Sequence, residues 1–449
     1  MKIVVKKGLD IPIAGAPSGA LRSFDKPRKI ALNLDPFADV RFKVLVKMGE
    51  IVQIGQPLVE NKAVPGMFFV SPAGGVVSAI RRGLKRRLLD IVIDVAEKEE
   101  IFQHDTAGVE SKEGLINLFL RAGIFPHIRQ RPFDLIAHPE HLPRAIFVRA
   151  VESLPFVPSA DLQIKGKEPY FRAGLEALSK IAPVHLVYDE GSTCQTFLES
   201  KDCTKHTVRG PHPRGNFSVH IHNILPIRKS DDYTWTVSLI GVISIGKMVS
   251  RGNYYHERIL SLGGSGFLET ERGFIKGRMG YPLEELLKGR VQEELLCVIS
   301  GDPLTGTKSE PTEFLHFYDT AVTVLPVNVE RQLLHFWRLG RKKYTATRCY
   351  LSGFFSPPKE GYSFTTNKHG EERAFIDGSV YDKVMPMQIP TMQLVKALLA
   401  QDYELAEVLG ALEVVKEDFA LPSFICPSKI EMMEIVHQGL HLYAKELGH

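Results

Sequence analysis

Grouped cysteines are absent from the sequence. Its 449 residues include five cysteines, at positions 194, 203, 297, 349 and 426, and none of them forms a C-x-x-C pair. An odd number of scattered thiols does not build a disulfide framework. Iron–sulfur clusters need thiolates in local groups, which the spacing does not provide. We therefore expect reduced cysteines, a cytoplasmic compartment and no cluster bound to this chain.

An excess of charge of one sign is also missing. Lysine and arginine total 56 and aspartate and glutamate total 52, which leaves a net charge of +4. General binding to nucleic acid requires a much denser positive charge. The hydrophobic share of 44% and the charged share of 24% are those of a folded protein. A chain of this length predicts three or four domains and no nucleic-acid partner.

Long apolar runs are absent as well. The longest uncharged run, 63–80, is interrupted by two prolines and three glycines, and the more apolar run 233–246 is shorter than the ~18 residues that a spanning helix needs. The first residues, MKIVVKKGLDIPI, hold too short an apolar stretch for an export signal and predict a strand. We expect no transmembrane segment in this chain.

A complete nucleotide-binding loop is missing too. GDPLTGTKS at 301–309 is close to a phosphate loop, but Thr307 separates Gly306 from Lys308, and the motif needs these two adjacent so that the ammonium reaches the phosphates. GGSG at 263–266 lacks the third glycine of a dinucleotide fingerprint. We expect that this chain neither hydrolyses nucleotides nor binds NADH itself.

The sequence does contain a β-rich N-terminal region, which we delimit as residues 1–104. Short alternating segments at 42–46, 75–80 and 89–95 are separated by glycine and proline turns. KMGEIV, GQPL and SPAGGV, between 47 and 76, resemble the biotinyl/lipoyl barrel. Lys62 is the candidate lysine for covalent attachment of a cofactor, but its spacing from Pro72 differs from the usual spacing in that family. The favoured interpretation is an exposed loop lysine without a bound cofactor.

Three further units complete an α/β multi-domain fold. Buried strands at 145–151 and 184–188, with an amphipathic helix at 168–181 between them, predict a parallel, Rossmann-like domain over 105–257. We expect the apolar run 234–244 to add a further buried strand. Residues 258–330 resemble a small β-grasp ligand-binding domain, in which a hairpin feeds a helix led by Pro282.

Residues 331–449 predict a connecting segment and a C-terminal helical domain. Ser428 and Glu431 have the spacing of a capping box for the last helix. The helical period then places one side-chain stripe on a common face, which comprises Ile430, Met433, His437, Leu440, Ala444 and Leu447.

A cluster of five positive charges lies within seven residues. It comprises Arg81, Arg82, Lys85, Arg86 and Arg87. Such a density attracts anionic lipid by ~1 kcal/mol per charge near a surface. Two interpretations are equally good. The cluster contacts an acidic partner or lipid headgroups, or it is simply a hairpin exposed to solvent.

Several motifs along the chain, taken together, carry a resemblance to one family. KKGLDIPIAG, SPAG, RPF, GPHP-x-G, GTK, KVMP and LGALE begin at positions 6, 71, 131, 210, 306, 383 and 409. In this order they resemble the NqrA family of the Na⁺-translocating NADH:quinone reductase. The chain is more weakly similar to the RnfC component of the Rnf complex and to the flavin-binding component of respiratory complex I. Those relatives carry clustered cysteines near the C-terminus, whereas this chain has only Cys426 in that region.

The resemblance implies a peripheral subunit on the cytoplasmic face of the bacterial inner membrane. The whole complex passes electrons from NADH to a quinone and exports Na⁺. Five partner subunits would handle NADH, flavins, iron and Na⁺, because this chain offers no metal, flavin or covalent cofactor site. This chain itself would dock to the partners and bind quinone, without a redox centre of its own. The isolated chain would be inactive. A purely structural adaptor is the alternative.

The candidate quinone-binding residues are Arg209, His212, His220 and His222. A quinone needs an apolar slot and donors for its two carbonyl oxygens, and the segment 209–222 concentrates such donors. On a strand, His220 and His222 would point to the same face. A metal site and purely structural histidines are the other interpretations, although no nearby cysteine or carboxylate completes a metal ligand set.

Overall fold

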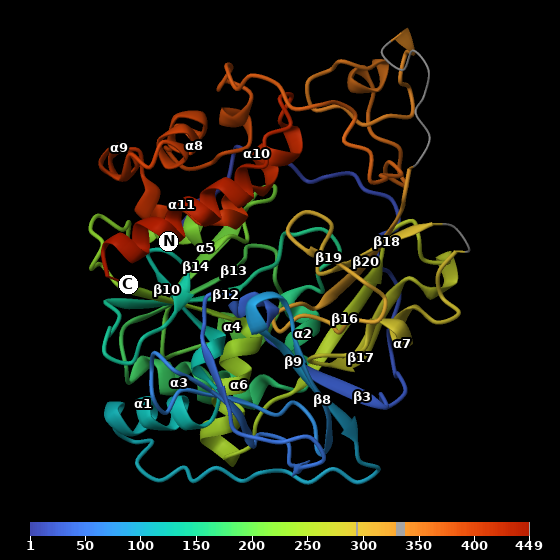
Figure 1. The fold of residues 1–449 in the computed structure, drawn as a ribbon. Helices are drawn as coiled ribbons and strands as arrows, with labels where there is room; N and C mark the ends of the chain where they lie inside the picture. Colours follow the sequence, from blue (N-terminus) through green and yellow to red (C-terminus); the bar gives the residue numbers. More distant parts are fainter. Residues whose placement is uncertain (293–294, 329–336, 449) are drawn as a thin grey trace.

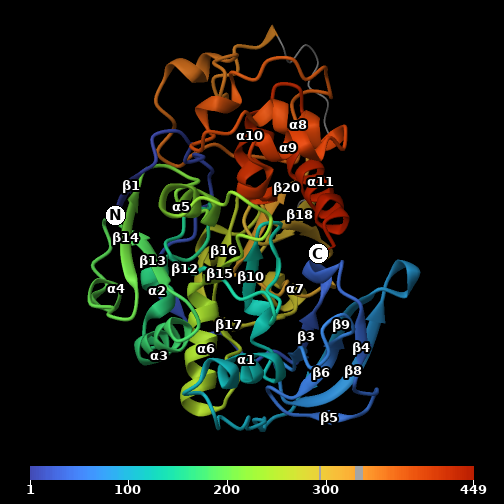
Figure 2. The same ribbon diagram turned by 90° about the vertical axis from the view of Figure 1, so that its left-hand side faces the viewer.

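The computed structural model describes residues 1–292, 295–328 and 337–448. Within these ranges the strands form sheets of seven, six, four and three strands. The C-terminal helices lie above the seven-stranded sheet, and the strands of residues 29–95 lie to one side of it (Figures 1 and 2). Every helix in the described part of the chain is too short or too polar to span a bilayer.

The N-terminal β-rich region contains two small sheets with a common core. One has the order β3-β9-β8-β5 and the other β4-β6-β7. Leu58 and Phe69 of the smaller sheet and Ile93 of the larger are buried in the same cluster. Lys62 is exposed between β6 and β7. The strands are β3 (Lys29–Asn33), β4 (Phe42–Val44), β5 (Ile51–Val52), β6 (Pro57–Asn61), β7 (Phe68–Val70), β8 (Gly75–Arg82) and β9 (Leu88–Val95).

A seven-stranded sheet of order β1-β14-β13-β12-β15-β10-β11 forms the centre of the molecule. Its strands are β1 (Lys2–Val4), β10 (Ile128–Arg131), β11 (Leu135–Ile136), β12 (Ala145–Ala150), β13 (Val184–Asp189), β14 (Thr204–Arg209) and β15 (Thr234–Ser238). β12 pairs in parallel with β13 and β15, whereas β10 is antiparallel to β15. The predicted parallel strand–helix–strand unit is confirmed, because α3 (Glu168–Ser179) joins β12 to β13.

The prediction of one strand over 234–244 was wrong in its second half. The strand ends at Ser238 and helix α6 (Leu239–Arg251) follows at once. The Ser238 hydroxyl accepts a hydrogen bond from the amide of Gly241 and caps this helix. A buried apolar run has no amphipathic period that separates helix from strand, so the sequence pattern did not reveal the switch.

The six-stranded sheet has the order β19-β18-β20-β16-β17-β2. The predicted hairpin consists of β16 (Glu257–Gly263) and β17 (Gly273–Arg278), and α7 (Leu283–Leu287) follows it with Pro282 as its N-cap. The other strands are β18 (Leu296–Ser300), β19 (Thr307–Ser309), β20 (Ala321–Pro326) and β2 (Leu21–Arg22). Because β1 and β2 join different sheets, the first 22 residues connect the two central sheets.

The two faces of the seven-stranded sheet are covered by different parts of the chain. Ile146, Val148 and Leu186 pack in one cluster with residues of α3 and α6. Phe147 and Val187, on the opposite face, pack with the C-terminal helices and with α5 (Phe217–Ile224). Those helices are α8 (Thr391–Leu399), α9 (Tyr403–Val408), α10 (Ala420–Ile425) and α11 (Met432–Glu446), with the short η8 (Ala411–Glu413) and η9 (Lys416–Phe419). Strands buried on both faces explain the continuous apolar runs in the sequence.

The predicted start of the last helix was wrong, and its predicted buried face was right only at Leu440 and Ala444. α11 begins at Met432, and the Ser428 hydroxyl donates to the carbonyl of Ala374 instead of forming a capping box. Lys429 adopts a φ of 56°, which turns the chain between the two positions of the box. Packing against α8 and η9 selects the neighbouring stripe of Met432, Val436, Gly439, Leu440, Tyr443 and Ala444, so that His437 is exposed.

Helices α3 and α6 cross at very short range, because glycines occupy the contact. A Cβ on Gly246 would lie 1.7 Å from the carbonyl oxygen of Tyr170, and one on Gly174 would lie 2.1 Å from that of Val242. Gly378 provides a contrast, because a Cβ there would meet nothing nearer than 3.5 Å.

We expect Gly246→Ala to lower the free energy of unfolding by ~1–3 kcal/mol or more, since the added methyl must push the helices apart. Gly378→Ala should change it by less than about 0.5 kcal/mol. Urea denaturation followed by circular dichroism measures both. Equal midpoints for the two variants would contradict the close crossing.

His127 is buried in the core and its Nε2 lies 3.1 Å from the Tyr254 hydroxyl. Burial lowers the pKa of His127 to about 3. The unfolded chain takes up a proton here below pH ~6.5, whereas the folded chain does not. The resulting stability is therefore present above pH ~6.5 and is lost as the pH falls below it.

We expect His127→Gln to weaken the pH dependence of the unfolding free energy between pH ~7.5 and ~5.5 by about 1 kcal/mol, because glutamine does not titrate. Tyr254→Phe removes the hydrogen bond but not the titration, and should lower stability equally at both values. Unchanged pH dependence in the glutamine variant would argue against a neutral buried histidine.

Candidate functional site

The predicted histidine pair does not lie on a strand. Residues 217–224 form helix α5, and residues two apart on a helix point ~200° apart. His220 is therefore fully buried, whereas His222 remains partly exposed and its Nδ1 lies 2.8 Å from Oε2 of Glu413. The run FSVHIHNI alternates as a strand would, and nothing in its pattern marks the helix.

The other candidates point in different directions. His212 is buried and its Nδ1 lies 2.9 Å from the Ser153 hydroxyl. The Nε2 of His220 donates to the carbonyl of Arg214 at 2.7 Å. Burial lowers the pKa of both His212 and His220 to about 3, so both are neutral near pH 7. Arg209 extends to solvent near Glu190. No group of three potential metal ligands occurs in the described parts of the chain.

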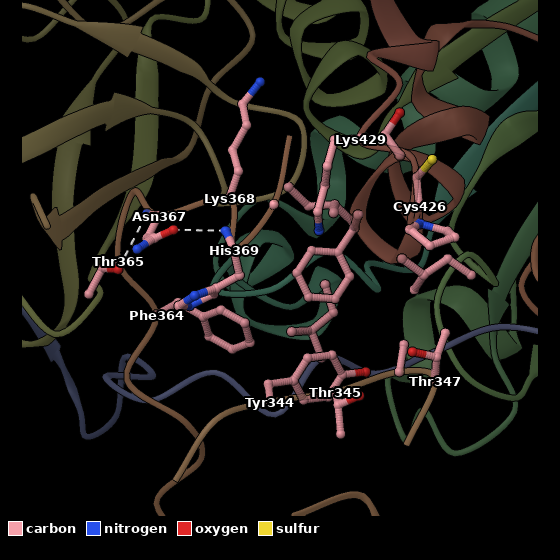
Figure 3. A pocket seen from close by; sticks show the side chains of 18 of the residues that line it. Tyr344, Thr345, Thr347, Phe364, Thr365, Asn367, Lys368, His369, Cys426 and Lys429 are labelled. Atoms are coloured by element: carbon pink, nitrogen blue, oxygen red, sulfur yellow. Dashed lines mark hydrogen bonds between the residues drawn. The ribbon is translucent and has the colours of Figure 1, made fainter. Parts of the chain in front are cut away.

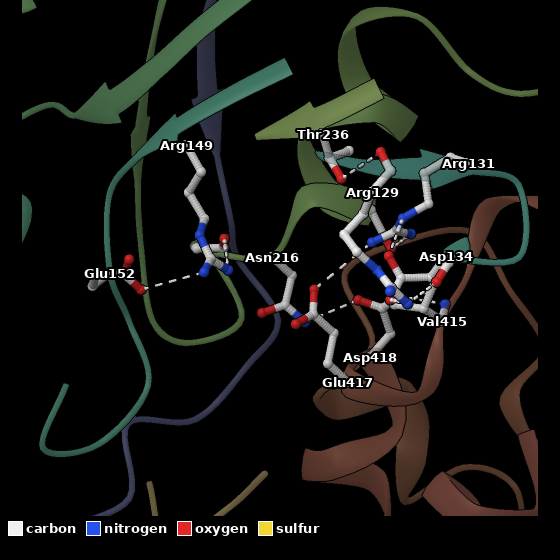
Figure 4. A network of polar contacts seen from close by, with 12 residues as sticks. Arg129, Arg131, Asp134, Arg149, Glu152, Asn216, Thr236, Val415, Glu417 and Asp418 are labelled. Carbon is white, nitrogen blue, oxygen red and sulfur yellow. Dashed lines mark hydrogen bonds and ion pairs between the residues drawn. The ribbon is translucent and has the colours of Figure 1, made fainter. Parts of the chain in front are cut away.

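α5 belongs to a buried polar network instead (Figure 4). Arg131 of β10, which is 2% exposed, donates to the Ser218 hydroxyl at 2.8 Å and lies 3.8 Å from a carboxylate oxygen of Glu417. Asn216 donates to Asp418 at 2.9 Å. Burial raises the pKa of Asp418 and raises that of Glu417 to about 7. The network fixes η9, and with it the C-terminal helices, to the sheet.

The basic cluster lies at the turn between β8 and β9. Arg81 forms two hydrogen bonds to the buried Asp90, at 2.7 and 2.6 Å, and Arg87 pairs with Asp35. Arg82 donates to the carbonyl of residue 86 at 3.2 Å. Lys85 and Arg86 stand at the tip with positive φ values, beside the 92% exposed Leu84. Only part of the predicted cluster is therefore available to a partner.

A cavity of about 640 Å³ lies where several parts of the chain meet (Figure 3). Its apolar walls are Ile11 and Ile13 of the N-terminal segment, Pro155 after β12, Pro303 and Leu304 of the loop between β18 and β19, Leu325 of β20, and Tyr344, Phe364 and Phe424. None of the four candidate residues of the sequence lines it. The loop that contributes Pro155 does follow the carboxyl end of a parallel strand, where ligands bind in open α/β sheets.

Three aromatic rings form one wall of the cavity. The ring of Tyr344 is 5.6 Å from that of Phe424 at an angle of 30°, and 5.6 Å from that of Phe364. Phe364 and Phe424 are 5.8 Å apart. Burial raises the pKa of Tyr344 to about 12, so its hydroxyl stays protonated and can donate a hydrogen bond. The wall offers flat apolar faces to a planar ligand.

The polar lining of the cavity includes two lysines. Lys368 pairs with Glu431, and the hydrogen bond raises the pKa of Lys368. Lys429 has no carboxylate partner within the described residues, and burial lowers its pKa. Cys426 also lines the cavity, and its Sγ lies 3.0 Å from the Tyr381 hydroxyl. The cavity therefore combines an aromatic wall with one partly desolvated cationic donor.

Sequence reasoning missed this cavity. Tyr344 and Phe364 lie in the region that the sequence predicted only as a connecting segment, and Phe424 lies beside Cys426, which was noted only as a lone thiol. The sole signal was the aromatic content of these stretches, which has no fixed spacing.

Comparisons with known proteins agree over the whole chain. Residues 3–96 match the NqrA N-terminal barrel-sandwich hybrid domain, and residues 110–254 match the NqrA second alpha/beta domain. The NqrA protein of the Na⁺-translocating NADH-quinone reductase of Chlamydia caviae is 38% identical over 100% of this chain and 98% of its own length. The corresponding protein of Yersinia pseudotuberculosis is 35% identical over 96% of each chain.

One solved structure aligns with 76% of this chain and with 62% of its own chain. It is that of an NAD⁺-reducing nickel–iron hydrogenase in the H₂-reduced state. Its TM-score is 0.39 and its sequence identity 12%. The full-length relatives, together with the two matched domains, confirm the family predicted from the order of the sequence motifs. The chain belongs to the NqrA family of the Na⁺-translocating NADH-quinone reductase.

Proposed function

We propose that this chain binds the quinone substrate of the reductase in the cavity beside Tyr344, Phe364 and Phe424. It does so as a peripheral subunit on the cytoplasmic face of the bacterial inner membrane, joined to five partner subunits. Those partners oxidise NADH, hold the flavins and iron and conduct Na⁺. The chain contributes a binding site and a docking surface, and no redox centre.

The aromatic cavity is the observation that carries this proposal. Its volume of about 640 Å³ lies within the range of small-molecule sites. A quinone ring is planar and apolar with two carbonyl acceptors, so it matches flat aromatic faces and a few donors. Leu325 lies on β20 of the six-stranded sheet and Leu304 lies in its β18–β19 loop, which agrees with the ligand-binding role expected of a β-grasp-like domain.

Lys429 is the residue best placed to act on a bound quinone. Its ammonium donates a hydrogen bond to a carbonyl oxygen, and a partly desolvated cation stabilises the negative charge that builds on that oxygen during reduction. Because burial lowers the pKa of Lys429, it also gives up a proton more readily than an exposed lysine. Electrons reach the ring from one of the partner subunits.

Two alternatives are tested by the same experiments. The competing location for the quinone remains Arg209, His212, His220 and His222. His212 and His220 each use one ring nitrogen for a bond within the fold, and the other ring nitrogen is buried without a hydrogen-bond partner among the described residues. A purely structural adaptor is the other alternative. The exposed tip at Lys85 and Arg86 supports a docking role in either case.

We expect Phe424→Ala to raise the KM for quinone in the assembled complex at least ten-fold, because it removes one face of the aromatic wall. Phe424→Leu should have a smaller effect. Phe102→Ala, which removes a ring that packs on His104 and does not line the cavity, is the matched control. NADH oxidation with an artificial acceptor should be unchanged in all three variants.

For Lys429, we expect Lys429→Met to lower the kcat of quinone reduction at least ten-fold and Lys429→Arg to restore most of it, because the charge is the active feature. Photo-crosslinking with a quinone analogue should label 344–373 or 423–431 in the purified chain. If the analogue instead labelled residues 209–222, and His212→Ala lost quinone reduction, the quinone site would lie in that segment. No labelling, together with parental kinetics in every variant, would favour the adaptor.

A further inference from the structure

The segment 337–359 exposes large apolar side chains together with positive charge. Trp337 is 80%, Leu339 73%, Phe354 67% and Phe355 61% exposed. Six lysines and arginines lie in the same stretch and no aspartate or glutamate does. Five of the six are exposed, whereas the ammonium of Lys343 is buried over the ring of Tyr350. No ion pair with a carboxylate involves any of these six in the described chain. In Figure 1 the orange segment lies at the outer edge of the molecule, beyond β18 and β20.

This surface is held by bonds within the segment. The amide of Leu351 donates to the carbonyl of Leu339 at 2.8 Å, and the amide of Cys349 donates to the Thr345 hydroxyl at 3.1 Å. Tyr344 anchors the segment by packing on Phe424 in the cavity wall. The exposed side chains are therefore presented on an ordered base, which reduces the entropy lost on binding.

We propose that segment 337–359 is an attachment surface for an anionic lipid bilayer. Tryptophan and phenylalanine enter the boundary between headgroups and acyl chains, and lysine and arginine are attracted to anionic headgroups. Lysine is depleted in the core of protein–protein interfaces, whereas two of the five exposed cations here are lysines. A bilayer also supplies the negative charge that this surface requires, without a dedicated acidic partner.

The chain provides its own reporter of this contact. It contains two tryptophans, of which Trp235 is fully buried and Trp337 is exposed. Entry of Trp337 into a bilayer shifts its emission to shorter wavelength, whereas Trp235 is already shielded from water. The experiment therefore mixes the purified full chain with vesicles of phosphatidylglycerol or of neutral phosphatidylcholine and records sedimentation and emission.

We expect binding and a blue shift with phosphatidylglycerol only, weakened when salt rises from ~0.1 to ~1 M. The triple variant Arg338→Glu, Arg341→Glu, Lys342→Glu should bind phosphatidylglycerol vesicles at least about 100-fold more weakly, because each positive charge removed weakens binding roughly five-fold. Lys165→Glu, Lys276→Glu, Lys288→Glu makes the same charge change at exposed sites elsewhere and is the control. Trp337→Phe should keep binding and abolish the shift.

Failure to bind phosphatidylglycerol, binding without the emission shift, or equal loss in both triple variants would overturn the proposal. If the segment variant also failed to assemble with the partner subunits while vesicle binding was absent, the surface would be a protein contact instead. These outcomes are independent of quinone reduction, because none of the altered residues lines the cavity.

Discussion

One face of the central sheet depends on the C-terminal helices for its burial. Phe147, Val187 and Val208 on that face pack with Leu394, Phe419 and Leu440, whereas α3 and α6 cover only the opposite face. A parallel sheet is stable in water when both faces are covered. The C-terminal region is therefore part of the central core rather than an appendage, and the cavity exists because this cover meets the N-terminal segment and the six-stranded sheet.

The contact between this cover and the sheet is polar at its centre. Arg131, Asp134, Asn216, Glu417 and Asp418 meet there, and Arg129, Ser218 and the amide of Val415 also bond to members of this group. Loss of Arg131 would remove a positive charge that faces the buried carboxyl groups of Glu417 and Asp418, which costs more than the pair itself contributes. Such a seam fixes the position of η9 on the sheet more than it adds stability, and it carries the RPF motif by which the family was predicted.

The sequence revealed elements with a distinct period and missed those decided by tertiary contact. The alternating barrel strands and the β12–α3–β13 unit follow from local patterns that burial reinforces. The run 234–244 and the stretch around His220 have patterns that fit either a helix or a strand, and only their packing decides. The cavity was beyond reach because Ile11, Leu304, Tyr344 and Phe424 are brought together by the fold and share no motif.

The pairing of the first 22 residues has a consequence for synthesis on the ribosome. β1 is the edge strand beside β14, and β2 pairs with β17, so both partners are made long after the strands themselves. At ~5–20 residues per second, β2 waits roughly 10 to 50 s for Arg278 to appear. Until then the barrel can fold, but its leading segment stays without a partner. Closure of the two central sheets by this segment is thus a late event in synthesis.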